Sequence, residues 1–218
     1  MVKNQETGPK SEDVLDMEKD GEFTTVTKRR RNIKASHKRR SGSGALIIGG
    51  SNVYRISIAA RNEYNIDRSM FKCVPGIVIE NVPNKLARAV QEVGVKEVDV
   101  VLHVGSDDLA AHRSVDYVLE GLATTIESSL MLQNVRDVVV CSVEERHDAG
   151  KDVYQNACGL NEQLSHLCST YGAKFLDLRR RLQECRFGGI NRTGVLYTAE
   201  GSHNVSQLLM SEVSGFLD

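Results

Sequence analysis

ALIIGGSN, residues 45–52, is the segment from which the architecture of this chain can be inferred. Its apolar run, ended by two glycines, is typical of a buried strand, and a helix-like segment follows at 52–62. In open sheets of parallel strands, ligands bind outside the carboxyl ends of the strands. Ser51 therefore carries a hydroxyl to the edge of the sheet where a site is expected.

The rest of the chain repeats this alternation. Further strand-type runs lie at 70–74, 98–104, 137–143 and 174–178, and helix-type stripes lie at 82–93, 115–130, 153–167 and 205–217. Strands separated by helices predict a three-layer α/β/α sandwich with a mainly parallel five-stranded sheet. The strands are almost continuously apolar, as expected when both faces of the sheet are buried. We expect one folded domain over residues 45–218.

Residues 1–44 have a different composition, dominated by charge, Ser, Thr and Gly, and show no hydrophobic periodicity. This composition predicts a disordered arm, which ends in the Ser/Gly linker 41–44. Residues 1–27 contain seven acidic and three basic residues, whereas residues 28–40 contain eight basic and no acidic ones. The net charge of −1 for the whole chain therefore hides an acidic segment followed by a basic one.

The basic segment is a candidate nucleic-acid-binding region. Its members are Lys28, Arg29, Arg30, Arg31, Lys34, Lys38, Arg39 and Arg40. Such a run can bind the phosphates of RNA or DNA, or direct nuclear import, and it can also be a solvated charge run without a partner. It has no aromatic residue for base stacking, so we expect any binding to be tolerant of sequence and sensitive to salt.

Other features narrow the class of protein. The five cysteines are odd in number and lack CxxC spacing, which argues against a disulfide framework or a zinc site. The polar start of the chain does not resemble a signal peptide, and no apolar run approaches 18 residues. We therefore expect an intracellular protein, cytoplasmic or nuclear, that needs no metal or organic cofactor.

Polar residues follow several of the predicted strands. Gly76 follows the second strand, Gly105-Ser106-Asp107-Asp108 follows the third, and Glu200 and His203 precede the stripe of the last helix. A serine, an imidazole and an acid that orients it are the parts of a covalent hydrolase.

Four blocks in this order resemble the SGNH/GDSL hydrolase family. The blocks are Gly50-Ser51, Gly76, HVGSDDL at 103–109 and EGSHN at 200–204, and they span the presumed folded part. The amino-acid sequences of these blocks are most similar to those of the SGNH-type domains of LINE-type retrotransposon proteins. Such domains often lie beside nucleic-acid-binding segments. The resemblance implies an ester or acetyl-ester substrate.

The resemblance also implies roles for residues. Ser51 would be the nucleophile, His203 the general base and Glu200 the acid, where the family has Asp. The backbone amides of Ser51 and Gly76 and the side chain at position 107 would hold the oxyanion. Position 107 is Asp where the family has Asn, and an ionised carboxylate cannot donate to a negative charge. A protonated Asp107 could donate, which would require a raised pKa.

Two functions stay open on this basis: a serine esterase or acyl hydrolase, weak or inactive because of Asp107, and a catalytically dead scaffold that binds protein or nucleic acid. A metal site built from Asp107, Asp108, Glu200 and His203 is a minor alternative. The segment 144–147 follows a strand at the same edge, where it could line the crevice, but a solvated loop is the favoured interpretation.

Overall fold

The computed structural model describes residues 40–144, 146, 148–186 and 188–213. Five parallel strands form one sheet in the order β2-β1-β3-β4-β5. The strands are β1 (Arg40–Gly49), β2 (Phe71–Cys73), β3 (Val95–His103), β4 (Val135–Cys141) and β5 (Lys174–Leu176). The predicted parallel five-stranded sheet is confirmed.

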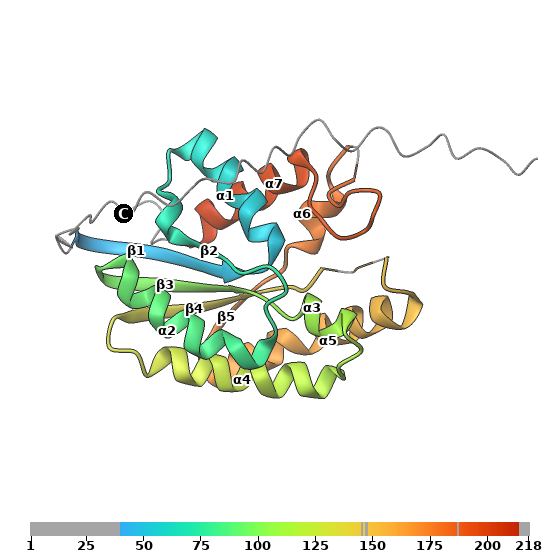
Figure 1. Cartoon of the computed structure of the whole chain (residues 1–218), viewed down its shortest axis with the longest axis horizontal. Coiled ribbons are helices and arrows are strands. Elements are labelled where there is room, and N and C mark those ends of the chain that lie inside the picture. Colours follow the sequence, from blue (N-terminus) through green and yellow to red (C-terminus); the bar gives the residue numbers. More distant parts are fainter. Residues whose placement is uncertain (1–39, 145, 147, 187, 214–218) are drawn as a thin grey trace, which may run out of the picture. The chain divides into compact units, whose positions relative to one another are not determined.

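Helices cover both faces of this sheet (Figure 1). One face carries α1 (Ser51–Tyr64), α6 (Arg179–Gln183) and α7 (Ala199–Glu212). The other carries α2 (Val82–Val93), α4 (Val115–Leu130) and α5 (Lys151–Tyr171), with the short α3 (Ser106–Ala110) beyond the end of β3. Two 3₁₀ turns, η1 (Arg68–Met70) and η2 (Ile79–Asn81), complete the described elements. The predicted three-layer arrangement is therefore present.

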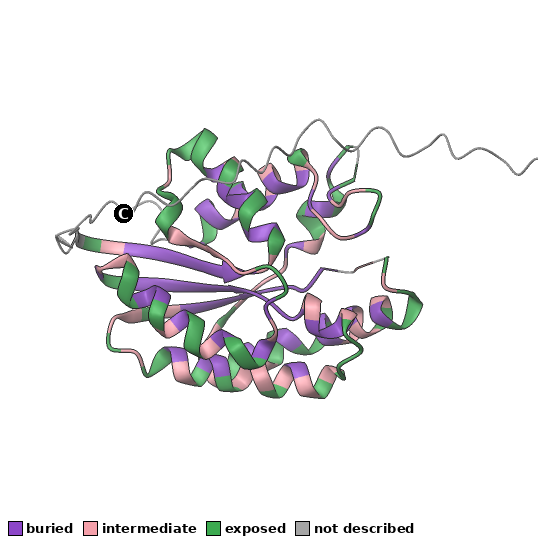
Figure 2. Cartoon of the chain, in the orientation of Figure 1, coloured by how far each residue is buried: buried purple, intermediate pink, exposed green. Residues whose placement is uncertain are grey.

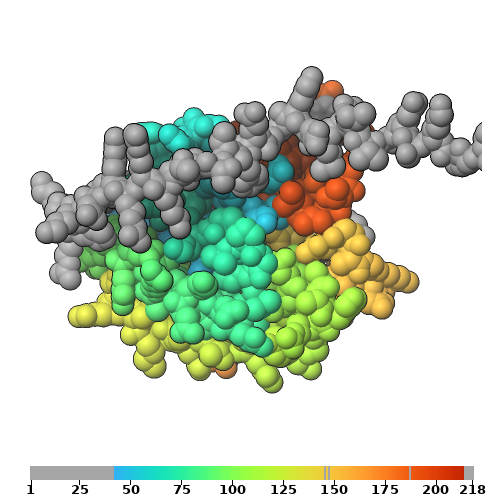
Figure 3. Space-filling view, in the orientation of Figure 1, coloured from blue at the N-terminus to red at the C-terminus, as the bar shows by residue number. Residues whose placement is uncertain are grey.

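Alternation along the strands builds a separate core on each face. Leu46 and Ile48 of β1 pack with the helices α2, α4 and α5, whereas Ala45 and Ile47 pack under α1 and α7. All four side chains are fully buried, and the central strands are purple along most of their length in Figure 2. In the space-filling view, the green and yellow-green side chains of α2 and α4 hide the sheet on their side (Figure 3).

The first strand begins earlier than the sequence predicts. Residues 41–44 were expected to be a linker, but β1 starts at Arg40 and pairs with β3 through Ser43↔Glu97 and Gly44↔Val98. The composition of Ser-Gly-Ser-Gly indicates flexibility, but pairing with a long neighbouring strand overrides it because β3 offers a ladder of backbone partners. β1 therefore begins five residues before the expected start of the ordered part at Ala45.

The last helix also begins earlier than its apolar stripe. The sequence predicts it at 205–217, whereas α7 starts at Ala199 because the side chain of Thr198 accepts a hydrogen bond from the backbone N–H of Gly201. This is an N-cap, which fixes the first turn of a helix. Glu200 and His203 therefore lie inside α7 rather than in a loop before it.

One glycine sets the edge of the sheet where the site lies. A Cβ added to Gly49 would lie 2.1 Å from the carbonyl oxygen of His103 on the neighbouring strand, so only glycine fits there. The chain turns from β1 into α1 immediately afterwards.

Within the described part of the chain, no helix has the length and apolar character needed to cross a membrane.

Candidate active site at the carboxyl edge of the sheet

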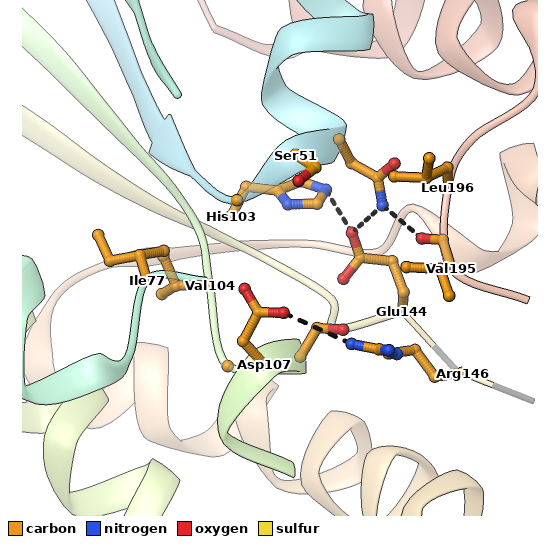
Figure 4. A pocket seen from close by; sticks show the side chains of 13 residues that line it. Ser51, Ile77, His103, Val104, Asp107, Glu144, Arg146, Val195 and Leu196 are labelled. Carbon is orange, nitrogen blue, oxygen red and sulfur yellow. Dashed lines mark hydrogen bonds and ion pairs between the residues drawn. The ribbon is translucent and has the colours of Figure 1, made fainter. Parts of the chain in front are cut away.

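A polar hollow with about 400 Å³ of open space lies at the carboxyl ends of β1, β3 and β4 (Figure 4). Its side chains include Ser51, Asn52, Ile77, His103, Asp107, Glu144, Arg146, Val195 and Leu196. This is the position at which sheets of this kind bind ligands. The hollow thus brings together two of the predicted site residues, Ser51 and Asp107.

Ser51 is the first residue of α1 and is exposed to solvent. Its hydroxyl makes no hydrogen bond to any described residue, and the N-cap Gly50 makes no capping bond through a side chain. Ser51 is therefore the first residue of the helix and not its cap. The hydroxyl faces the hollow, beside the backbone N–H groups of the first turn of α1, which favour a negative charge.

A buried polar network forms the floor of the hollow. Nε2 of His103 lies 2.8 Å from the hydroxyl of Tyr197 and 3.3 Å from Oε1 of Glu144. The side chains of His103 and Glu144 are only 3% and 6% exposed. The favoured interpretation of 144–147 as a solvated loop is thus wrong for Glu144, which lies inside the protein.

Asn52 connects this network to the start of α1. Its amide nitrogen donates to Oε1 of Glu144 at 2.9 Å and to the carbonyl of Val195 at 3.0 Å. Its carbonyl oxygen accepts from the backbone N–H of Tyr197 at 2.8 Å. Asn52, the residue after Ser51, therefore holds both the carboxylate of Glu144 and the segment 195–197 in place.

Asp107 lies against Gly50, since a Cβ at position 50 would be 3.2 Å from its Oδ2. Its Oδ1 lies 3.4 Å from Nη1 of Arg146, which is also held by Asp148 at 2.6 Å. Burial raises the pKa of Asp107, Arg146 opposes this rise, and Glu144 adds to it. The raised pKa of Asp107 is a shift in the direction that favours the protonated form of this carboxyl group.

Asp108 has a structural role. Its two carboxylate oxygens accept from the backbone N–H of Ile79 at 3.2 and 3.1 Å, which holds the segment after Gly76 onto α3. In the described residues, no group of three or more His, Cys, Asp or Glu side chains could hold a metal. The four residues of the alternative metal site do not gather.

The structure does not bring His203 or Glu200 to Ser51. Nδ1 of His203 contacts Oε1 of Glu63, near the other end of α1. Glu63 is twelve residues beyond Ser51, which is about 18 Å along a helix. Glu200 accepts a hydrogen bond from the backbone N–H of Arg186 at 2.9 Å. The early start of α7 causes this separation, because it turns both side chains onto the flank of a helix.

Val195 and Leu196 approach Ser51 where the predicted base was expected. Both line the hollow, and Leu196 and Ser51 also line an adjoining apolar groove with Tyr54, Cys73 and Pro75. Pro75 and Ile77, which flank Gly76, each line one of these two spaces. The predicted nucleic-acid-binding residues Lys28 to Arg39 lie outside the described residues, and only the backbone of Arg40 is described, in β1.

Three residues of the hollow were not assigned from the sequence: His103, Glu144 and Arg146. A signal for His103 and Glu144 was present, because His103 ends β3 and Glu144 follows β4 by three residues. Polar residues at these positions converge at one edge of a parallel sheet. The apolar residues around His103 made it resemble part of a core strand.

No protein-family model matches this sequence, and no curated relative matches it. Solved structures do resemble the fold. A lipolytic protein of the G-D-S-L family from Veillonella parvula is 16% identical with a TM-score of 0.64, over 79% of this chain and 99% of that one. A GDSL-like lipase from Bacteroides thetaiotaomicron is 15% identical with a TM-score of 0.64, over 79% and 88%. The acetyl xylan esterase AlAXEase is 18% identical with a TM-score of 0.60, over 78% and 99%. Residues 40–213 thus have the α/β fold of GDSL/SGNH lipolytic hydrolases.

Proposed function

We propose that this domain is a slow serine acyl hydrolase that cleaves small esters at Ser51. The observation that carries the proposal is the exposed, unpartnered hydroxyl of Ser51 in a hollow that also contains an imidazole–carboxylate pair. The fold is shared with lipolytic proteins and with an esterase of acetylated xylan, which supports an ester as the substrate class. The nucleophile would be Ser51, as the sequence resemblance implies.

The rate should be low because of Asp107. A negative charge beside Gly50 opposes the developing oxyanion, and the backbone amides of Ser51 and Gly76 would act against this repulsion. Loss of one oxyanion donor typically reduces kcat by ~10²–10³. Arg146 lines the hollow and partly neutralises Asp107, so we expect the activity to be weakened rather than abolished.

The test is the hydrolysis of p-nitrophenyl acetate by the wild type, Ser51→Ala and Asp107→Asn. We expect a slow rate that Ser51→Ala removes and that Asp107→Asn increases. His203→Gln is the matched control, since His203 is a solvent-exposed imidazole outside the hollow. A rate that is the same in the wild type and in Ser51→Ala would exclude this function.

The second candidate is a module that binds a ligand without hydrolysing it. The apolar side chain of Leu196, which lines the hollow together with Ser51, favours this candidate. In this case all variants would be inert. Binding of RNA or DNA by residues 28–40, and the relation to retrotransposon-type proteins, rest on the sequence and stay predictions. Either candidate is compatible with a nucleic-acid-binding arm, because the arm and the hollow are separate parts of the sequence.

A further inference from the structure

We propose that His103, oriented by Glu144, is the general base that activates Ser51. This inference rests on the proposed function and assigns to His103 and Glu144 the roles that the family resemblance implies for His203 and Glu200. The three side chains come from three neighbouring places at one sheet edge: the start of α1, the end of β3 and the segment after β4. All three line the same hollow (Figure 4).

The two ring nitrogens of His103 have different surroundings. Nε2 faces Oε1 of Glu144 and the hydroxyl of Tyr197. Nδ1 has no hydrogen-bond partner in the described part of the chain. In the same part of the chain, Tyr117 Oη and Ser206 Oγ are the side-chain polar atoms that are fully buried and have no partner. Nδ1 of His103 is not one of them. Nδ1 is therefore not completely buried, and His103 is one of the residues that line the hollow.

The surroundings of Nε2 determine which nitrogen holds the proton. An ionised carboxylate only accepts hydrogen bonds, so Glu144 favours the proton on Nε2 and leaves the lone pair on Nδ1. Tyr197 stays protonated, since burial and then the charge of Glu144 raise its pKa well above the usual value. Asn52 fixes Glu144 by donating to Oε1. A carboxylate on one nitrogen and a lone pair on the other is the arrangement that a general base for serine requires.

The chemistry balances with water as the second substrate. Ser51 Oγ forms a bond to the ester carbonyl carbon while its proton moves to Nδ1 of His103. The bond from this carbon to the alcohol oxygen then breaks, and the alcohol leaves with that proton. Water attacks the acyl–serine, its proton passes through Nδ1 to Ser51 Oγ, and a carboxylic acid is released. The Ser51 hydroxyl and Nδ1 of His103 form no hydrogen bond with each other in the described residues, and catalytic hydrogen bonds often form only in the complex with substrate.

Other groups that titrate near His103 must be separated from it. Asp107 on α3 and Arg146 after β4 face the same hollow, and His103 lowers the pKa of Asp107. The experiment therefore uses the Asp107→Asn protein as the parent, which removes one titrating carboxyl group. It measures kcat/KM for p-nitrophenyl acetate from pH 5 to 9 after subtraction of the rate of the same protein with Ser51→Ala.

We expect kcat/KM of the parent to rise with pH until the general base is deprotonated, and to become constant above that pH. His103→Gln should lower the constant value by ~10²–10⁴-fold and remove the rise. Glu144→Gln should lower it, whereas Glu144→Asp should restore part of the rate. His203→Gln should leave both the value and the profile unchanged. Circular dichroism and Tm establish that each variant folds.

The outcomes separate this inference from the proposed function. Loss of Ser51-dependent hydrolysis in His203→Gln, or its retention in a folded His103→Gln, would overturn the role of His103. If His103→Gln does not fold, a Glu144→Gln protein whose kcat/KM equals that of the parent at every pH overturns it. If the parent itself shows no Ser51-dependent rate, the proposed function fails and the base assignment falls with it.

Discussion

The carboxylate of Asp107 lies where an oxyanion donor is expected, against Gly50 and next to Ser51. Asn at this position would offer an N–H group in place of a negative charge. We therefore predict that Asp107→Asn raises kcat by ~10²–10³-fold, the usual contribution of one oxyanion donor. Steady-state kinetics with p-nitrophenyl acetate measure this change. An unchanged or lower kcat in the variant would show that Asp107 does not oppose the reaction.

The same residue predicts a dependence of stability on pH. Burial raises the pKa of Asp107 in the folded protein despite Arg146, so the folded state holds this proton more tightly than the unfolded chain. Ionisation of Asp107 therefore destabilises the fold as pH rises above the unfolded value of ~3.9. Asp107→Asn should leave Tm unchanged near pH 3 and raise it at pH 7. A rise at pH 3 and none at pH 7 would contradict this.

His103 shows why the sequence pointed to His203 as the base and not to the imidazole that lines the hollow. Glu200 and His203 have the spacing of an acid and a base, and a sequence does not show which side of a helix faces a site. His103 lies in the apolar run VDVVLHV, where an imidazole resembles a core residue. Its partner Glu144 is distant in sequence, so only the packing of β3 beside β4 reveals the pair.

At the scale of elements, most of the fold could be predicted. The ranges of α2 and α4 agree with their stripes at 82–93 and 115–130, because these helices pack one apolar face on the sheet. The short α3 and α6 were missed, since five residues give no periodic signal. The start of α7 was missed because it depends on a cap rather than on an apolar stripe.

The cap of α7 gives a prediction for stability. Thr198→Ala removes the side-chain acceptor for the N–H of Gly201, which typically costs about 1 kcal/mol. We expect Tm to fall by about 2–4 °C in a domain of this size. Thr170→Ala is the matched control, since Thr170 is exposed within α5 and bonds only the carbonyl of His166. Equal Tm values for the two variants would exclude a capping role.

At the scale of the molecule, the boundary of the folded part is testable. Residues 40–44 pair with β3, so a protein that begins at residue 45 loses this part of the ladder. Each lost hydrogen bond should cost about 1 kcal/mol. We expect urea denaturation to show that a protein of residues 40–218 is more stable than one of residues 45–218. Equal midpoints would restore the boundary that the Ser/Gly composition indicates.

The basic segment gives a prediction for the whole chain. If all eight basic residues contact phosphates of duplex DNA, the slope of log K against log salt approaches about −7. The acidic residues before it should weaken this binding, so deletion of residues 1–27 should raise the affinity. Fluorescence anisotropy at several salt concentrations measures both quantities. An affinity that does not change on deletion would remove the inhibitory role of the acidic segment.

The central claim is that Ser51 is a nucleophile, and labelling by a fluorophosphonate tests it most directly because one covalent event is enough. Intact-protein mass spectrometry would follow the wild type and Ser51→Ala at equal concentration, and peptide mapping would locate the adduct. We predict one phosphonyl group on Ser51 in the wild type and none in Ser51→Ala. A wild type that stays unlabelled, or an adduct at another residue, would contradict the assignment of an acyl hydrolase and leave the binding module as the function of this fold.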